Sequence, residues 1–197
     1  PLNCKTNRAE KAGACGEKNV MRIAKFYPHM FEEPPISGKN GSGTIFFTGC
    51  SLRCAFCQNY SLSRSERGRE ITPRELADIF KKLEDAGVHN VNLVTPTHFV
   101  PEIAEAFEIY RPKIPVVYNT HSYETTKTLE IIDPYVDIYL PDLKFYSPGI
   151  SKRYTGKADY FSVAEKAITF MMNSKKTEFF ENGMMKSGVV VRHMIMP

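Results

Sequence analysis

The feature that most limits the possible folds of this sequence is its alternation of short apolar runs with longer helix-like stretches. The runs that predict strands are Thr44–Thr48, Val91–Val94, Val116–Asn119, Val136–Leu140 and Val189–Met196. The stretches that predict helices run from Thr72 to about Gly87, and over about Pro101–Tyr110, Glu124–Ile132 and Ala158–Met172. Helices of this length can cross over between parallel strands, so the pattern predicts a parallel α/β domain.

The helix after Thr72 has the clearest local signals. Thr72 and Glu75 form a capping box, with Pro73 at the first helical position. The apolar residues that follow keep the spacing of one helix face, and they are Leu76, Ile79, Phe80 and Leu83. Gly87 is a typical residue just past a helix end.

The domain organisation follows from a change in residue composition near residue 40. Residues 1–40 are polar and contain Pro34 and Pro35, which predicts an irregular N-terminal extension, whereas residues 41–197 form the core domain. The chain starts at Pro1 without Met and stops at Pro197 directly after a strand-like run. We expect a fragment of a longer protein.

Composition excludes several classes of protein. Of the 197 residues 42% are hydrophobic, the net charge is only +4, and no run approaches the ~18 apolar residues of a membrane span. No signal peptide is visible. Five cysteines, three of them clustered, are typical of reduced thiols or a metal site rather than of a secreted disulfide framework. The sequence predicts a cytoplasmic protein that binds neither membrane nor nucleic acid.

Polar residues follow the ends of successive predicted strands. If the sheet curls into a barrel, these ends meet at one face, which is where the active sites of such barrels lie. The residues are Cys50, Cys54 and Cys57; Thr95, Pro96, Thr97 and His98; Asn119, Thr120, His121 and Ser122; Asp142 and Lys144; and Arg192 and His193. A purely structural barrel does not require such a series.

The spacing C-x3-C-x2-C brings three thiols close together at Cys50, Cys54 and Cys57. Soft thiolates hold iron–sulfur clusters, and three ligands on a four-iron cubane leave one iron open to a substrate or cosubstrate. Two alternatives remain open from spacing alone. One is a zinc site with Cys15 or a histidine as fourth ligand, and the other is a set of buried, inert thiols.

The stretch GTIFFTGCSLRCAFCQN resembles the radical S-adenosylmethionine (SAM) superfamily, in which an aromatic residue, here Phe56, precedes the last cysteine of the motif. Within it the chain is most similar to the pyruvate formate-lyase activating enzymes and their uncharacterised relatives, which share the lead-in seen at Glu32–Gly38 and Gly41–Phe47. The resemblance covers nearly the whole chain. It implies a partial (β/α)6 TIM-like barrel of parallel strands, here without its last unit.

The resemblance also implies roles for individual residues. Cys50, Cys54 and Cys57 would hold a [4Fe-4S] cluster whose open iron chelates SAM, and the backbone near Phe56 would touch the adenine. The family's Gly-Gly-Glu motif after the second strand is replaced by Thr95-Pro96-Thr97, so backbone carbonyls and the Thr97 hydroxyl are the expected contacts of the SAM amino group.

The later strand ends carry further implied contacts. Activating enzymes often have an Asp-Thr-Asn-Gly type of turn after the third strand. This sequence has Asn119-Thr120-His121-Ser122 at that place, so any cation site built there has lost one charge. Asp142 would serve the ribose or a nearby cation, and Lys144 the SAM carboxylate. Arg192 and the Met194 backbone would line the SAM pocket.

The implied activity is reductive cleavage of SAM to a 5′-deoxyadenosyl radical, with no protein acid, base or nucleophile in the cleavage step. The implied partner is a glycyl-radical enzyme whose backbone glycine is activated, and the electron donor is flavodoxin or ferredoxin by analogy. A radical SAM reaction on a small molecule is the first alternative, and a non-enzymatic zinc-stabilised barrel is the second.

Residues outside these motifs have plainer predicted roles. We expect His98 and His121 to be polar lining, and Glu32 and Glu33 to anchor the lead-in. Because neighbouring strand residues face opposite ways, only one of Arg192 and His193 should reach the site, and Arg192 is favoured. Cys4 and Cys15 lie in the extension, where a second metal site is a weaker hypothesis.

Overall fold

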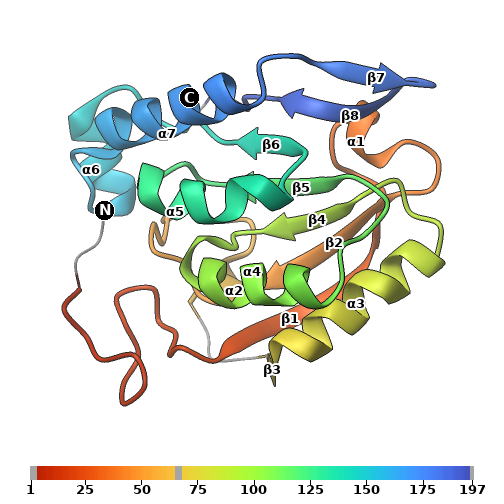
Figure 1. The fold of residues 1–197 in the computed structure, drawn as a ribbon. Coiled ribbons are helices and arrows are strands. Elements are labelled where there is room, and N and C mark those ends of the chain that lie inside the picture. The colour runs from red at the N-terminus through yellow and green to blue at the C-terminus, as the bar shows by residue number, and fades with distance from the viewer. Residues whose placement is uncertain (1–3, 65–67, 196–197) are drawn as a thin grey trace.

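The computed structural model describes residues 4–64 and 68–195, so Pro1, Met196 and Pro197 lie outside the described residues (Figure 1). The strands are β1 (Met21–His29), β2 (Ser42–Phe47), β3 (Arg69–Ile71), β4 (Val91–Val94), β5 (Val116–Thr120), β6 (Ile138–Pro141), β7 (Phe179–Glu181) and β8 (Met184–Val189). The α-helices are α1 (Pro34–Ser37), α2 (Tyr60–Ser63), α3 (Pro73–Asp85), α4 (Val100–Ile109), α5 (Thr126–Ile132), α6 (Pro148–Thr155) and α7 (Tyr160–Ser174). Two 3-10 turns cover Thr97–Phe99 and Asp133–Tyr135.

The strands form one sheet in the order β3-β1-β2-β4-β5-β6-β8-β7. The pairs β2–β4, β4–β5, β5–β6 and β6–β8 are parallel, whereas β1, β3 and β7 join by antiparallel pairing. The sheet curls without closing. The predicted α/β class is confirmed, and the architecture is that of a partial TIM-like barrel.

The helices α3, α4, α5 and α7 cover one face of the sheet (Figure 1). The capping box that predicted α3 is present, with the Thr72 hydroxyl accepting from the Glu75 backbone and the Glu75 carboxylate accepting from the Thr72 backbone. The apolar stripe of α3 is buried against strand residues such as Leu93. Burial of each large apolar side chain contributes about 2 kcal/mol to this layer.

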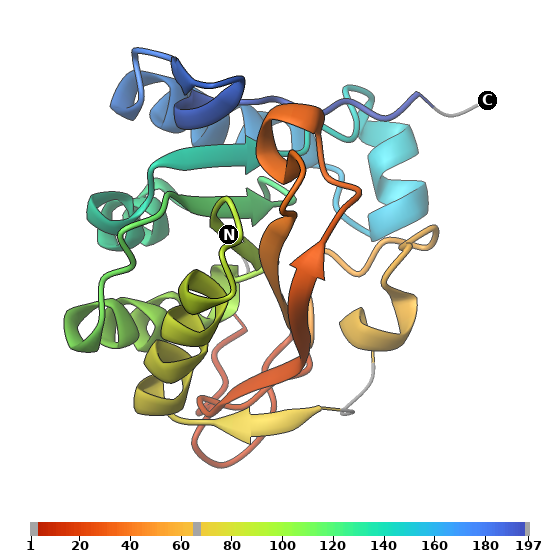
Figure 2. The ribbon, with the colours of Figure 1, turned by 90° about the vertical axis from the view of Figure 1, so that its right-hand side faces the viewer.

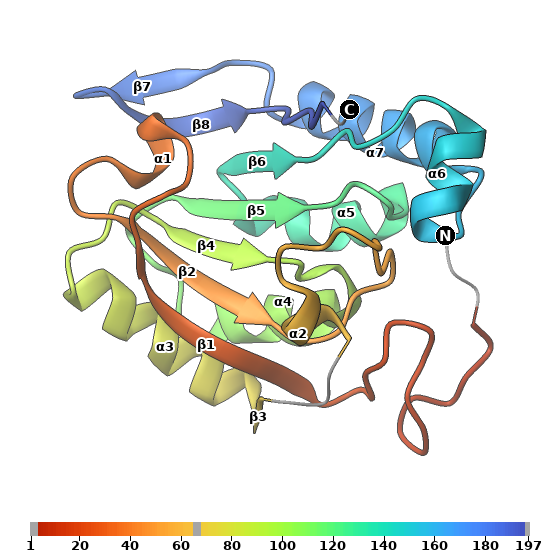
Figure 3. The ribbon, with the colours of Figure 1, turned by 180° about the vertical axis from the view of Figure 1, so that it is seen from behind.

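The opposite, concave face carries α1, α2 and the segment between β2 and α2 (Figure 3). Ile36 of α1 packs against Val117, Ile138 and Met185, and it closes the end of the lumen at which the parallel strands begin. In Figure 2 the orange segment with β1 and α1 crosses the front of the curled sheet. The lumen is therefore filled at one end and hollow at the carboxyl ends of the strands.

Two predictions about the ends of the chain were wrong. The extension is not irregular throughout, because residues 21–29 form β1, which pairs with β2. Its sequence signal was weakened by Pro28, which lies beyond residues 21–23, the part of β1 that pairs with β3. The pairing of β1 with β2 is irregular between Ile23 and Lys25.

The last strand lies earlier than the predicted Val189–Met196. Asn182 and Gly183, both at positive φ, make the turn of a β7–β8 hairpin, and β8 ends at Val189. In the described residues beyond it, an isolated bridge joins Arg192 to Asp142, and the Val190 N–H donates to the Tyr139 carbonyl (2.9 Å). β4 has the predicted bounds, and the other predicted elements are present with shifted ends. No helix in residues 4–64 and 68–195 is long and apolar enough to cross a membrane.

Candidate functional site

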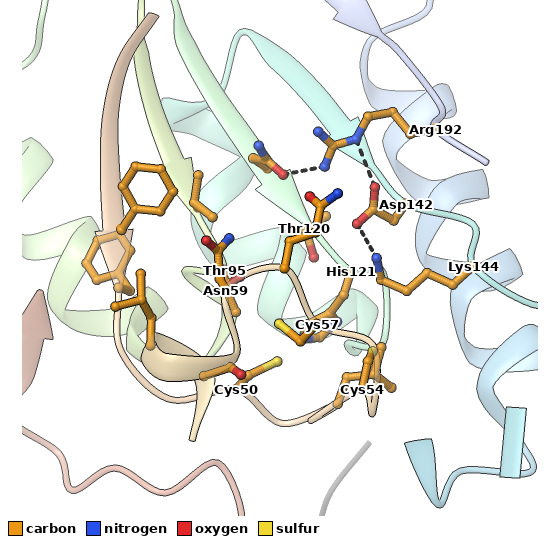
Figure 4. Close-up of a pocket in the computed structure, with 18 of the residues that line it drawn as sticks. Cys50, Cys54, Cys57, Asn59, Thr95, Thr120, His121, Asp142, Lys144 and Arg192 are labelled. Atoms are coloured by element: carbon orange, nitrogen blue, oxygen red, sulfur yellow. Dashed lines mark hydrogen bonds and ion pairs between the residues drawn. The ribbon is translucent and has the colours of Figure 1, made fainter. Parts of the chain in front are cut away.

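A cavity of about 550 Å³ opens at the carboxyl ends of the parallel strands (Figure 4). Most of the predicted site residues line it, and they are Cys50, Cys54, Phe56, Cys57, Thr95, Asn119, Thr120, Asp142, Lys144, Arg192 and Met194. Figure 4 shows the three cysteines grouped at one end, with the strand-end residues across from them. Parallel strand direction brings these residues together, because every loop that follows a strand emerges at the same rim.

The cysteine loop, residues 48–59, has little regular structure of its own. Cys50 and Cys54 are buried, Cys57 is partly exposed, and all three are free thiols. Distant backbone groups hold the loop in place: the Cys50 N–H donates to the Cys15 carbonyl (3.0 Å), and the Ala55 N–H donates to the Tyr154 carbonyl (2.9 Å). The loop conformation therefore depends on the rest of the fold.

The N-terminal extension lies directly against the start of this loop. The buried Glu17 accepts a hydrogen bond from the Thr48 hydroxyl (2.7 Å) and lies 3.6 Å from the Arg22 guanidinium. Gly49 has φ +73°, and a Cβ there would lie 2.5 Å from the Glu17 side chain. Only glycine fits this approach.

Two histidines tie the loop to neighbouring strand ends. His121 Nδ1 accepts from the Tyr123 N–H (3.0 Å), so its Nε2 carries the proton and donates to the Ser51 hydroxyl (3.1 Å). His98 Nε2 donates to the Thr48 carbonyl (2.7 Å). Burial lowers the pKa of His98 to about 4 and that of His121 to about 3, so both rings are neutral at pH 7.

A network of charges joins the other strand ends. The Arg192 Nε donates to Asp142 Oδ1 (2.8 Å), and the Lys144 ammonium lies 2.7 Å from Asp142 Oδ2. Both oxygens of Asp142 are thus paired with a cation. Burial raises the pKa of Glu32, and the nearby Arg192 guanidinium opposes that shift. Glu32 and Glu33, which were expected to anchor the lead-in, also line the cavity.

Aromatic side chains fix the backbone around the last cysteine. The Phe56 ring packs edge-on against Phe145 and Tyr154, with ring centroids 5.7 Å apart in both cases. The Tyr160 hydroxyl accepts from the Lys144 N–H (2.9 Å) and donates to the Asp142 carbonyl (2.8 Å). Because these contacts come from α6 and α7, the helices position the loops of the site.

The segment after β4 holds a residue in an unfavourable conformation. Thr95 has φ +58°, although a β-branched residue rarely adopts the left-handed region, and its N–H donates to the Asn119 carbonyl (2.9 Å). Pro96 and Thr97 do not line the cavity. The Thr97 hydroxyl is buried away from it, so the side-chain contact expected of Thr97 is not supported by its position.

Sequence reasoning missed one wall of the cavity, which comes from β1 and its continuation. Lys25, Tyr27, His29 and Phe31 line it at a spacing of two residues, beside Phe46 of β2. That alternation was the available signal, but Pro28 obscured it. His193 lines the cavity together with Arg192, so the prediction that only one of the two would reach it was wrong. The chain has left the regular sheet at this point, and strict alternation no longer applies.

The donor set fits an iron–sulfur cluster. Three free thiols lie on one cavity wall, and burial raises the pKa of Cys50 and raises that of Cys54 to about 12. Buried thiols of this kind are protonated at pH 7 when no metal is bound. A soft metal centre is what stabilises their thiolate forms.

Comparison with known proteins agrees with this chemistry. The family model of the radical SAM superfamily matches residues 44–185, well over half of the chain. The uncharacterized protein MJ0674 of Methanocaldococcus jannaschii is 29% identical over 203 residues, which cover 98% of this chain and 55% of that protein. The chain thus spans about half the length of this relative. With its three-cysteine loop at the carboxyl ends of a curled parallel sheet, the chain belongs to the radical SAM superfamily.

Proposed function

We propose that Cys50, Cys54 and Cys57 hold a [4Fe-4S] cluster, and that SAM binds beside it in the cavity for reductive cleavage to a 5′-deoxyadenosyl radical. Membership of the superfamily implies an enzyme that uses this cluster and SAM. The observation that carries the assignment to these residues is that the three thiols and the strand-end side chains line the same cavity.

One-electron reduction of the SAM sulfonium is the chemistry that such a cluster supplies when bound, and it releases methionine. The protein's own residues bind and orient SAM. Lys144 is the proposed partner of its carboxylate, because its ammonium is held beside the cysteines by Asp142. Asn119 and Thr120 line the same cavity as Lys144. The Phe56 backbone, fixed by two rings, is proposed to contact the adenine.

The proposed target is a backbone glycine of a partner glycyl-radical enzyme, with flavodoxin or ferredoxin as the electron donor. This finer assignment rests on the resemblance of the lead-in Glu32–Gly38 and the cysteine loop to the activating enzymes.

The cluster assignment is tested on anaerobically reconstituted protein with Cys57→Ala as the variant and Cys15→Ala as the matched control. We expect Cys57→Ala to lose the electron paramagnetic resonance (EPR) signal of the reduced cluster and all 5′-deoxyadenosine formation. Cys15→Ala should keep both. Wild-type protein that binds iron but whose cluster spectrum does not respond to SAM would contradict the proposal.

The target assignment needs a separate experiment. Active wild-type protein is mixed with candidate glycyl-radical enzymes, and the expected product is the EPR signal of a glycyl radical. Formation of 5′-deoxyadenosine without that signal in any of them would favour a small-molecule substrate instead.

A further inference from the structure

The guanidinium of Arg192 lies at the centre of a set of oxygens. Its Nε is 2.8 Å from Asp142 Oδ1, its Nη2 is 2.6 Å from Asn119 Oδ1, and its Nη1 is 3.3 Å from Glu32 Oε2. Glu33 Oε1 is more distant, at 3.8 Å from Nη1. Each nitrogen of the guanidinium faces an oxygen acceptor.

These acceptors come from parts of the chain that are far apart in sequence. Asn119 belongs to β5, Asp142 follows β6, and Glu32 lies between β1 and α1. Arg192 follows β8, and it sits 160 residues from Glu32. One side chain thus joins the region after β8 to the segment after β1, across the open side of the sheet. Figure 4 shows Arg192 at the top of the cavity with its contacts to the strand ends.

The local charge explains why a cation is needed at this place. Three carboxyl groups converge here, those of Glu32, Glu33 and Asp142, and they are opposed by Arg192 and Lys144. Glu32 and Glu33 are mostly removed from solvent, and Glu33 Oε2 is buried without a hydrogen-bond partner. Carboxylate and amide oxygens are also the ligand types that hard metal cations prefer, but in the described part of the chain no three acidic, histidine or cysteine side chains are placed to hold a metal ion.

We propose that Arg192 is a built-in cation of the SAM pocket, which fills the place of a metal ion and positions Asp142 and Asn119. The inference rests on the proposed function, in that SAM is the ligand of the pocket. With Arg192 present, SAM binding requires no added alkali or alkaline-earth cation. Arg192 is a positioning residue, because each of its three guanidinium nitrogens faces a protein oxygen and its proposed effect on SAM acts through Asp142 and Asn119.

Lys144 shows why the position of this charge matters. Its ammonium contacts Asp142 Oδ2 and still has two protons for another acceptor. Without Arg192, Lys144 becomes the main cation near three carboxyl groups. It is then drawn toward them and is less available to a bound carboxylate.

The first test measures SAM binding by calorimetry on anaerobic, cluster-loaded protein in buffer whose only cation is tetramethylammonium, too large for the site. Wild-type affinity should change less than about twofold when K⁺, Na⁺ or Mg²⁺ is added. Arg192→Ala should weaken binding about tenfold or more, as expected for lost hydrogen bonds to charged groups, and K⁺ or millimolar guanidinium should restore most of it. In Arg192→Lys the ammonium keeps the charge but lacks the planar guanidinium. Its affinity for SAM should therefore lie between those of wild type and Arg192→Ala.

The second test does not depend on the cluster. In the protein without cluster, the melting temperature of Arg192→Ala should rise with K⁺ or guanidinium, while that of wild type stays unchanged. Arg192→Ala combined with Glu32→Gln should lose this response, because one carboxylate charge has been removed. Arg111→Ala, which breaks a pair with Asp137 outside the cavity, is the matched control and should show no cation response.

The two tests separate the inference from the proposed function. A wild-type cluster that does not bind SAM overturns the proposed function, but the cation response of the melting temperature can still be read. A wild-type protein that needs K⁺ or Mg²⁺ for SAM overturns the inference. So does an Arg192→Ala variant, folded as judged by circular dichroism, that responds to no cation in either test.

Discussion

Two segments that each follow a strand of this sheet are built in opposite ways. Helix α3 follows β3 and is held by residues within its own first turn and by its apolar stripe. The cysteine loop follows β2 and is held by Cys15, His98, His121 and Tyr154, which lie up to about a hundred residues away in the sequence. The first segment is specified locally, and the second depends on the whole domain.

The difference shows where function is sensitive to mutation. A local signal contributes about 1 kcal/mol and can be lost without moving distant parts of the chain. A contact such as Ser51–His121 fixes two loops at once, so its loss affects both stability and the position of the thiols. If this contrast holds, a mutation that breaks a contact between distant segments has a larger effect than one that removes a local signal.

Replacing His121 by Ala should have the largest effect. His121 is buried, and its ring joins Ser51 to the Tyr123 backbone. Loss of packing and of both hydrogen bonds should lower the free energy of unfolding by about 3 kcal/mol, measured by urea titration. The reconstituted cluster should also be lost faster in air. A variant that is as stable as wild type and keeps its cluster equally long would refute the role of this contact.

The second prediction concerns pH and His98. The pKa of His98 is about 4 in the folded protein, below the 6.5 of an exposed histidine, so the unfolded chain binds the proton more readily. The contribution of the neutral His98 ring to the free energy of unfolding is therefore complete above pH 6.5. It falls by about 1 kcal/mol per pH unit as the pH is lowered toward 4.

His98→Gln isolates this contribution, because glutamine can still donate to the Thr48 carbonyl but does not titrate in this range. The difference in unfolding free energy between wild type and variant should shrink or reverse as the pH falls from 6.5 to 4. Parallel pH profiles of the two proteins would show that His98 is not held neutral.

The smallest effect is expected for Thr72→Ala, which removes the capping box of α3. The free energy of unfolding should fall by about 1 kcal/mol. Iron content and the SAM response of the cluster should stay unchanged, because α3 lies on the face of the sheet opposite the cavity (Figures 1 and 3). Thr72→Ser, which keeps the hydroxyl, is the matched control. If Thr72→Ala lost its cluster, the distinction between a locally specified helix and a loop held by distant contacts would be wrong.

The periodic elements could be read from the sequence, because their signals are local. The spacing of Leu76, Ile79 and Phe80 predicted α3, and short apolar runs predicted β4, β5 and β6. β1 was missed because its alternation is interrupted at Pro28 and because most of its residues are only partly buried. β8 was misplaced because the Asn182-Gly183 turn was not recognised as the turn of a hairpin.

The site was predicted in part for the same reason. Strand ends in a parallel sheet share one rim, so Cys50, Asn119 and Asp142 could be assigned to one place from sequence order alone. The wall formed by Lys25, Tyr27 and His29 could not, because nothing in the sequence says which strand pairs with β2.

The three thiols, the parallel α/β layers and the rim that carries the polar residues could be assigned without a structure. These follow from residue type, spacing and strand direction, which act over a few residues. The folded molecule was needed to see that Arg192 contacts Glu32, Asn119 and Asp142, and that two neutral histidines hold the cysteine loop. Such contacts depend on how a sheet curls, and that curvature is a property of all its strands packed together.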